Sequence, residues 1–293
     1  MLAARWEWNW PWLGASLALA AFLFAGRSWK WQKLIQSLDG SITYPESCRS
    51  YLGGMPLGLV TPGRLGELSR CLFLPQASVH NLAGAGRVMM DNWTDFLAVL
   101  VWSTLGLYIL WGWPGALLGL GLSLLFNQLG LWLKVLRRLL SVLPALKGLT
   151  EIRARIEKEI PSLENLPARD YVLACTAGIA LFGLEWLQLD FVLRFLGFQP
   201  SSFLILGGLM ALATLANSIQ ITVAGVGVRE GLAVLLLAKA GVDYRVSLVA
   251  AFLQFAMNLM IPALAGLAVK PRGSLKGLLS FGAPEGATAT KAS

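Results

Sequence analysis

The sequence has 293 residues, of which 56% are hydrophobic and only 14% are charged, and its mean hydropathy is +0.63. A soluble domain carries roughly a quarter charged residues, so this composition excludes a soluble globular enzyme and indicates a polytopic membrane protein whose outer surface faces lipid. The net charge of +8 lies mostly between the apolar runs, where basic residues mark the cytoplasmic side. The charge therefore indicates membrane topology and no nucleic-acid partner.

Cysteine and histidine are too sparse to indicate a cofactor site. The cysteines are few and scattered and His80 is the only histidine, so a disulfide framework, a His-rich zinc site and a Ser-His-Asp triad are not indicated. We expect no metal and no other cofactor, and we interpret His80 as a solvated loop residue. The cysteines are Cys48, Cys71 and Cys175.

The first apolar run covers residues 11–26 and predicts a transmembrane helix. Tryptophans precede it and basic residues follow it, which is the order of an interfacial aromatic anchor, a span and a basic stop. No small-residue cleavage site follows the run, so we expect this helix to be retained rather than removed as a signal peptide. The flanking residues are Trp6, Trp8, Trp10 and Trp12 on one side and Arg27, Lys30 and Lys33 on the other.

The second apolar stretch, residues 44–74, is interrupted by the sequence Thr61-Pro62-Gly63-Arg64-Leu65-Gly66-Glu67. A helix over residues 45–60 would be about 24 Å long at 1.5 Å per residue, which is shorter than a hydrocarbon core of about 30 Å. Proline and glycine then end that helix. The pattern therefore favours a re-entrant hairpin over a full crossing of the membrane.

The rest of the chain repeats the same kinds of segment. Residues 134–170 form the one extended hydrophilic stretch, and their basic amphipathic pattern predicts a cytoplasmic helix bound to anionic lipid headgroups. The apolar segments around it are two spans near residues 89–113 and 115–133, a span at 171–196, a stretch at 203–240 broken between Asn217 and Gly227, and a last span at 245–269.

This order predicts an all-α polytopic membrane protein in which two re-entrant helical hairpins and about five full transmembrane helices form an inverted repeat. We expect the plasma (inner) membrane of a prokaryote, with most basic residues and the C-terminus on the cytoplasmic side. The parts of this single integral membrane domain, residues 1–293, are a first repeat at about 41–133, the cytoplasmic linker at about 134–170, a second repeat at about 171–269 and a disordered basic tail at 270–293. Inverted repeats bind substrates near the midplane, between broken helices.

Ionisable residues at membrane depth are the candidates for function, because a charge at the bilayer centre costs at least about 2.5–3.5 kcal/mol. An Arg and a Glu follow each predicted break, at a new helix N-terminus, where free backbone N–H groups, glycines and a guanidinium suit a phosphate. The candidate substrate-binding residues are Arg64, Glu67, Arg229, Glu230, Asp91 and Asp95, and the candidate hairpin-tip backbone positions are Pro62, Gly63, Gly66, Gly225 and Gly227. We predict no catalytic residue and no metal ligand.

Structural interpretations of these residues stay open. The two Arg–Glu motifs can pair only with each other to fasten the hairpins together, and Asp91 can cap its helix while Asp95 lines a cavity. Asp190 and Arg194, spaced i,i+4, are interpreted as a structural pair, and the neighbouring Glu185 is expected to face a cavity.

Three motifs carry a resemblance to a known family: Pro62-Gly63-Arg64-Leu65-Gly66-Glu67, Asp91-Asn92-Trp93-Thr94-Asp95 and Ala224-Gly225-Val226-Gly227-Val228-Arg229-Glu230. In these motifs, and in their order from about Trp12 to Val269, the sequence resembles the flippase-like family named for the transmembrane region of lysylphosphatidylglycerol synthase. It departs from that family at Asn92, where the family has Arg, and at Thr222-Val223-Ala224, which replaces a proline-rich lead into the second break.

The resemblance implies movement of a lipid across the bilayer: aminoacylated phosphatidylglycerol in the fused synthases, and polyprenyl-linked or hopanoid-type lipids in stand-alone members. Because residues 134–170 are the only long hydrophilic segment, we expect a transport module without a soluble synthase domain, a flippase rather than an enzyme. Two alternatives stay open: a membrane-embedded glycosyl- or acyl-transferase with Glu67, Asp91 or Glu230 as base, and a non-catalytic membrane partner of a soluble lipid synthase. The candidate partners are the lipid substrate, a lipid-modifying synthase and a second copy of the chain.

Overall fold

The computed structural model describes residues 8–38, 41–75, 81–128, 166–200, 202–217 and 227–272, together with residues 130–132, 134 and 138. For residues 62–65, 81, 82, 216, 217, 228 and 229 it describes the backbone and not the side chains. Most of the predicted linker at 134–170 and of the predicted basic tail at 270–293 therefore lies outside the described residues, as does Gly225.

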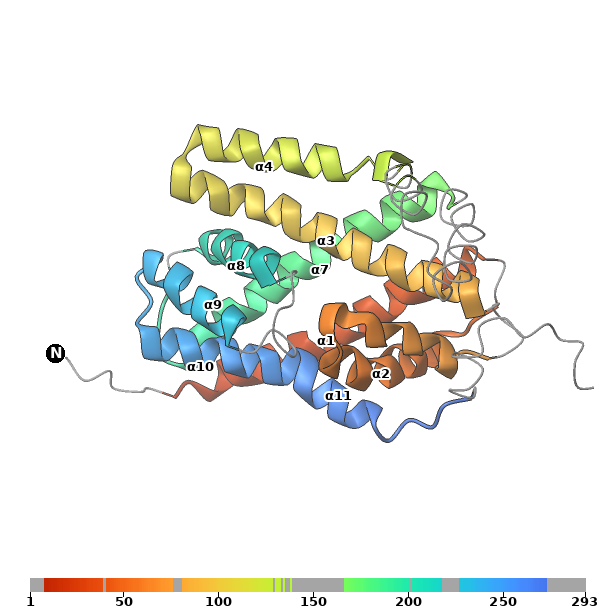
Figure 1. Cartoon of the computed structure of the whole chain (residues 1–293). Coiled ribbons are helices and arrows are strands. Elements are labelled where there is room, and N and C mark those ends of the chain that lie inside the picture. Colours follow the sequence, from red (N-terminus) through yellow and green to blue (C-terminus); the bar gives the residue numbers. More distant parts are fainter. Residues whose placement is uncertain are drawn as a thin grey trace, which may run out of the picture.

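Every regular element among the described residues is a helix, as the sequence predicts (Figure 1). Before the linker come α1 (Trp10–Gln36), α2 (Tyr44–Val60), the 3₁₀ helix η1 (Pro62–Phe73), α3 (Asn81–Trp111) and α4 (Trp113–Phe126). After it come α7 (Ala168–Phe195), α8 (Phe203–Asn217), α9 (Val228–Lys239) and a continuous helix made of α10 (Tyr244–Phe255), the π-helical turn η3 (Ala256–Met260) and α11 (Ile261–Gly266).

Within the described part of the chain, three helices are long and apolar enough to cross a membrane, namely Ala83–Trp111, Ala168–Phe195 and Tyr244–Gly266. They coincide with three of the predicted spans. The predicted first span lies within α1, which is 27 residues long, but α1 does not meet the same criterion of length and hydropathy. The count of about five full crossings therefore stays a prediction.

The span predicted over residues 115–133 is too long. α4 ends at Phe126 after 14 residues, which corresponds to about 21 Å. Asn127 is the C-cap of this helix, and its backbone N–H donates to the carbonyl oxygen of Ser123 at 3.0 Å. The side-chain oxygen of Asn127 accepts a hydrogen bond from the Tyr171 hydroxyl at 2.9 Å, so this polar residue anchors the end of α4 to the start of α7.

α2 and η1 form an antiparallel helical hairpin that turns at Thr61. The Thr61 hydroxyl donates to the carbonyl oxygen of Leu57 at 2.7 Å and accepts from the backbone N–H of Gly66 at 2.6 Å. Glycine is required at position 66, because a Cβ there would lie 2.1 Å from the Leu57 carbonyl oxygen. Farther from the turn, Gly58 of α2 faces Glu67 of η1.

α8 and α9 pack against each other as the second helical pair. α8 ends at Asn217 and α9 begins at Val228, so the second break predicted between Asn217 and Gly227 stays a prediction. Gly227, the residue before α9, has a φ of 91°, a backbone conformation that glycine adopts at little cost. Residues 218–226 lie outside the described part of the chain.

The two halves of the chain pack reciprocally. α3 of the first half lies against α8 of the second, α11 of the second half lies against α2 of the first, and α1 lies against α7. The α3–α8 contact is close, since a Cβ on Gly106 would lie 2.1 Å from the carbonyl oxygen of Gly208. The α11–α2 contact is equally close, since a Cβ on Gly266 would lie 2.2 Å from the carbonyl oxygen of Leu52. The long helix that follows each helical pair therefore contacts the first helix of the other pair.

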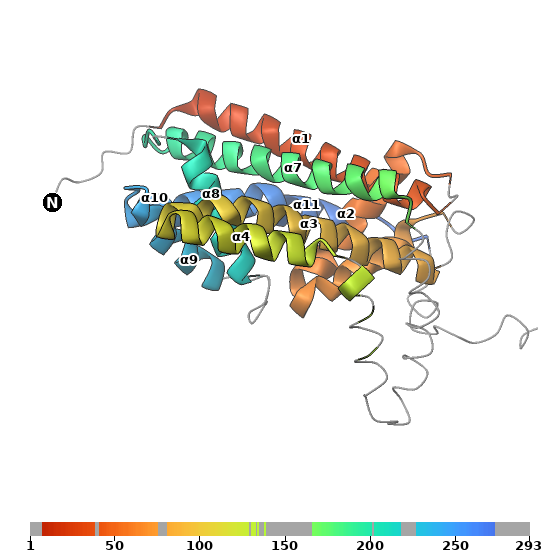
Figure 2. The ribbon, with the colours of Figure 1, turned by 90° about the horizontal axis from the view of Figure 1, so that it is seen from above.

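The two helical pairs lie toward opposite ends of the bundle (Figure 1), and α1 and α7 run side by side along one face (Figure 2). Where α1 begins and α7 ends, the backbone N–H of Asn9 donates to the carbonyl oxygen of Phe195 at 3.1 Å. At the other end, the N–H of Arg272 donates to the carbonyl oxygen of Leu72 at 2.9 Å. The chain after α11 is thereby attached to the first hairpin.

The apolar core falls into two main clusters. One includes Trp31 and is built mainly from α1, α2, η1 and α3. The other includes Trp186 and is built mainly from α7, α8, α9 and α10. Each half of the chain therefore has its own core, and the polar groups described below lie among helices of both halves.

Candidate functional site

A buried network of ion pairs joins α1, η1 and α3. Lys30 Nζ lies 3.0 Å from Asp91 Oδ1 and 2.5 Å from Asp95 Oδ1. Arg70 Nη1 lies 2.6 Å from Asp91 Oδ2, and Arg70 Nη2 lies 2.8 Å from Glu67 Oε2. Lys30 and Arg70 are each only 1% exposed. Asp91 therefore bridges two buried cations that come from different elements.

Aromatic rings and a buried serine fix Arg70 in this network. The guanidinium carbon lies 4.2 Å from the centroid of the Tyr51 ring and 5.7 Å from that of the Trp31 ring. The Ser50 hydroxyl donates to the Arg70 carbonyl oxygen at 2.8 Å and accepts from Trp31 Nε1 at 3.1 Å. A desolvated cation–π contact contributes about 2 kcal/mol. Four elements, α1, α2, η1 and α3, thus meet around one arginine.

The charges of this network are nearly balanced, with the two cations facing three carboxylates. A buried charge that loses its partner costs about 3–5 kcal/mol, so each member depends on the others. Asp95 is more exposed than the rest of the network: 23% of its side chain is accessible, whereas each of the other four side chains is at most 4% accessible. Asp95 is therefore the member of the network that a ligand can reach.

A second polar cluster joins α1, α7 and η3. Arg27 of α1 forms an ion pair with Glu185 of α7, and each side chain is 16% exposed. Gln188 Nε2 donates to the carbonyl oxygen of Ser16 at 3.2 Å, and Asn258 Nδ2 donates to Gln188 Oε1 at 2.7 Å. Asn258 lies on the π-helical turn, and such turns are frequent at functional sites.

A small cavity lies between the ion-pair network and the second polar cluster. It measures about 10 Å³, close to the volume that one water molecule requires. Its lining includes Arg27 of the second cluster, Tyr51, which contacts Arg70 of the network, and Asn258. The other lining residues are apolar, namely Ala20, Leu23, Phe24, Met55, Met257 and Pro262.

The start of α9 presents a separate arrangement. The Glu230 carboxylate accepts a hydrogen bond from the backbone N–H of Gly227 at 2.8 Å, and Glu230 is 9% exposed. This contact satisfies a backbone donor at the helix start, where helices lack internal partners. Arg229 lies between these residues in sequence, and its side chain is outside the described part of the structure.

The structure brings together three of the six predicted substrate-binding residues, Glu67, Asp91 and Asp95. The interpretation of Asp91 as a helix cap is wrong, because α3 begins at Asn81 and Asp91 lies within it, paired with two cations. Among the predicted tip positions, Pro62, Gly63 and Gly66 lie at the start of η1 and Gly227 lies directly before α9. Glu230 lies at the start of α9, where it accepts a hydrogen bond from Gly227. The side chains of Arg64 and Arg229, and the whole of Gly225, fall outside the description.

The sequence did not single out the cations of the two clusters. Arg27 and Lys30 are predicted to belong to a basic stop after the first span, and Arg70 is not among the candidate residues, yet all three are held by carboxylates inside the bundle. One signal was available: Arg27 and Lys30 are spaced i,i+3, so they share a face of α1. Arg70 is likewise three residues after Glu67, on the same face of η1.

The i,i+4 pair is confirmed, with Arg194 Nε 2.6 Å from Asp190 Oδ2. Glu185 pairs with Arg27. Among the residues that the structure describes, no three His, Cys, Asp or Glu side chains are grouped in a way that could hold a metal ion.

Comparison with known proteins identifies the family. A family profile described as the lysylphosphatidylglycerol synthase TM region matches residues 1–266, which include both helical pairs and the ion-pair network. Searches of curated proteins and of solved structures found no significant match. The match extends over most of the chain, and it agrees with the helices of the described residues, three of which are long and apolar enough to cross a membrane. The chain therefore belongs to the family of the lysylphosphatidylglycerol synthase TM region, a family of lipid-related membrane domains.

Proposed function

We propose that this protein moves a phosphate-bearing lipid, either a phospholipid or a polyprenyl-linked lipid, across the bilayer through a site near the membrane midplane. The observation that carries the proposal is the reciprocal packing of the two halves, in which each long helix lies against the other half's helical pair. In this account α2–η1 and α8–α9 are re-entrant hairpins of an inverted repeat, and they enter from opposite sides of the membrane. The family supports a lipid as the substrate.

The headgroup binds between the turn of the first hairpin and the start of α9. Arg64 and Arg229 supply guanidinium groups for the phosphate, and the helix dipoles add a partial positive charge at the two helix starts. Gly63 and Gly225 let the phosphate approach the backbone closely.

The ion-pair network holds the first hairpin in a fixed position beside this site. Arg70 attaches η1 to α3 through Asp91, and Lys30 attaches α1 to the same carboxylate. The hairpin therefore moves together with α1 and α3 as one body. Asp95, the accessible member of the network, faces the lipid path and contacts hydroxyl or amino groups of the headgroup.

Alternating exposure of the site then requires the two halves to tilt against each other. The α3–α8 and α11–α2 contacts are the surfaces about which they tilt, because backbones approach closely there without intervening side chains. The end of the bundle where α1 and α11 finish faces the cytoplasm in this account, since the basic linker at 134–170 also begins and ends there.

A headgroup-accessibility assay tests the proposal. Purified protein is reconstituted into vesicles that contain a trace of phosphatidylethanolamine carrying a fluorophore on its headgroup, and the impermeant reductant dithionite is added. Lipid that reaches the outer leaflet is bleached, so an active protein raises the bleached fraction from about one half toward completion. The key variant is Arg229→Gln, and its matched control is Lys239→Gln, an exposed cation at the other end of the same helix.

We expect Arg229→Gln and Arg64→Ala to slow lipid movement at least about tenfold, the factor that about 1.4 kcal/mol of lost phosphate binding produces. Lys239→Gln should retain the wild-type rate. Equal bleaching in wild type, all variants and protein-free vesicles would overturn the proposal for the lipid tested. Equally fast bleaching with wild type and with Arg229→Gln would show that the protein moves lipid, but it would exclude the proposed binding site.

A further inference from the structure

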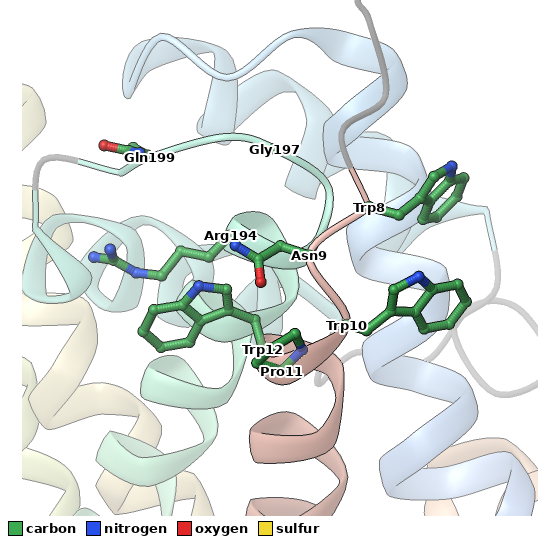
Figure 3. A pocket seen from close by; sticks show the side chains of 8 residues that line it. All are labelled: Trp8, Asn9, Trp10, Pro11, Trp12, Arg194, Gly197 and Gln199. Atoms are coloured by element: carbon green, nitrogen blue, oxygen red, sulfur yellow. The ribbon is translucent and has the colours of Figure 1, made fainter.

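A hollow of about 510 Å³ lies at the end of the bundle where α1 begins and α7 ends (Figure 3). The tryptophan-rich segment before and at the start of α1 forms one wall, and the last turn of α7 with the following loop forms the other. Its volume falls in the range of about 300–1,000 Å³ that is typical of ligand pockets. The lining shares no residue with the ion-pair network or with the helical pairs.

Arg194 is the one charged side chain that lines this hollow among the described residues. Its Nε lies 2.6 Å from Asp190 Oδ2, and its guanidinium carbon lies 5.2 Å from the centroid of the Trp12 ring. One third of the Arg194 side chain is exposed, against 6% for Asp190. The carboxylate and the indole therefore hold the guanidinium in one orientation and leave part of it available to a ligand.

The hollow favours an anion over a cation. The face of Trp12 is already occupied by Arg194, and Trp8 and Trp10 contact each other and Phe195, with centroid distances of 5.1–6.5 Å. The face of Trp12 that Arg194 covers is therefore not available to an ammonium group. The amide groups of Asn9 and Gln199 add hydrogen-bond donors, and the first turn of α1 contains no acidic residue, so its helix dipole also favours negative charge.

The position of the hollow indicates the source of the anion. Trp8 and Trp10 are 53% and 66% exposed, and exposed tryptophans at the end of a membrane bundle lie at the level of the lipid headgroups. The wall that carries them is fixed, because Asn9 N–H bonds to the carbonyl oxygen of Phe195. Arginine binds phosphate through two parallel hydrogen bonds. We propose that this hollow binds the phosphate-ester headgroup of an anionic lipid from the adjacent leaflet, independently of the transport site.

Native mass spectrometry of the purified full-length protein tests this proposal. The probes are dihexanoyl phosphatidylglycerol, dihexanoyl phosphatidylcholine and free glycerol phosphate, added in turn. The variant is Arg194→Gln, and Asp190→Asn/Arg194→Gln is measured beside it so that no buried carboxylate is left unpaired. The control is Arg245→Gln, which removes an exposed cation in the first turn of α10 that does not line the hollow.

We expect phosphatidylglycerol to bind more tightly than phosphatidylcholine, and both Arg194 variants to lose at least about tenfold in affinity for it, while Arg245→Gln binds like wild type. Glycerol phosphate binding with the same dependence on Arg194 would show that the phosphate ester alone is recognised. Binding of the lipid alone would assign the site to a membrane lipid. Equal binding of the two lipids, or affinity unchanged in both Arg194 variants, would overturn the proposal, whatever the outcome of the transport assay.

Discussion

Arg70 of η1 and Asp91 of α3 form the contact that most directly attaches the first helical hairpin to a membrane-spanning helix. Arg70 Nη1 lies 2.6 Å from Asp91 Oδ2, and no more than 4% of either side chain is exposed. The same carboxylate also pairs with Lys30 of α1. One buried aspartate of α3 therefore links that helix to both α1 and the hairpin.

Removing either cation of this network should destabilise the protein. Lys30→Met and Arg70→Met each leave a buried carboxylate without one of its partners, and we expect a loss of about 3–5 kcal/mol in the free energy of unfolding. Lys33→Met, one turn farther along α1, is the matched control, because Lys33 makes its described side-chain contact only with Gln36 at the surface. Thermal unfolding in detergent measures the difference. Equal midpoints for Lys30→Met and Lys33→Met would contradict this account of the network.

The close contact between the two halves should not tolerate a side chain. A Cβ at position 106 would lie 2.1 Å from the Gly208 carbonyl oxygen, so Gly106→Ala forces α3 and α8 apart, at a cost of about 1–3 kcal/mol. Gly121→Ala in α4 is the control, because nothing lies within 4 Å of its Cβ position and alanine favours the helix by about 1 kcal/mol. Thermal midpoints should fall for Gly106→Ala and hold or rise for Gly121→Ala. The opposite order would show that this contact is looser than described.

The start of α9 should depend on the glycine before it. Gly227 has a φ of 91°, where an alanine costs about 1–2 kcal/mol, and its N–H is the donor that Glu230 accepts. We expect Gly227→Ala to lower the thermal midpoint and to slow lipid movement, because the helix start that carries Arg229 is displaced. Gly231→Ala, within the same helix and with open space at its Cβ position, should do neither. Loss of transport in both variants would argue against a special role for this turn.

The start of α2 should show a pH-dependent contribution to stability. Glu46 accepts hydrogen bonds from the backbone N–H and the hydroxyl of Thr43, and it pairs with Arg272 at 3.1 Å. These contacts, the backbone hydrogen bond first, lower the pKa of Glu46 below its usual value of 4.5. A carboxyl whose pKa is lower in the folded state stabilises the protein at neutral pH, and that stabilisation is lost as the pH falls through the folded-state pKa. Glu46→Gln should therefore lower the thermal midpoint at neutral pH and have a shrinking effect below about pH 4. An effect of Glu46→Gln that is independent of pH would assign the contact to packing instead.

The sequence predicted the parts of the fold that depend on local chemistry. Apolar runs placed the three long helices, and Pro62 and Gly227 marked where new helices begin, because proline and glycine act on the backbone at their own positions. The length of α4 was misjudged for a different reason. Its apolar residues continue past Asn127, and a hydrogen bond from Tyr171, 44 residues away in sequence, anchors the helix end.

Only part of the candidate site could be predicted, because the rest depends on contacts between residues far apart in the sequence. Asp91 and Asp95 stood out as charges within an apolar run, but Lys30 and Arg70 lie close to the ends of apolar runs, where basic residues ordinarily mark the membrane surface. Their burial follows from tertiary packing, since α1, η1 and α3 must meet before any of these ion pairs exists. The i,i+3 spacings show which of these side chains share a helix face, but no local pattern shows which faces pack together.

The most direct test of the central claim is the position of a lipid phosphate in an experimental density map of the protein in lipid nanodiscs. The account predicts phosphate density between residues 61–67 and 224–230, within hydrogen-bond distance of the guanidinium groups of Arg64 and Arg229. The opposite result would be direct ion pairs between the guanidinium groups of Arg64 and Arg229 and the carboxylates of the opposite motif, with no lipid between the two hairpins. That result would contradict the account and assign these residues a structural role in holding the hairpins together.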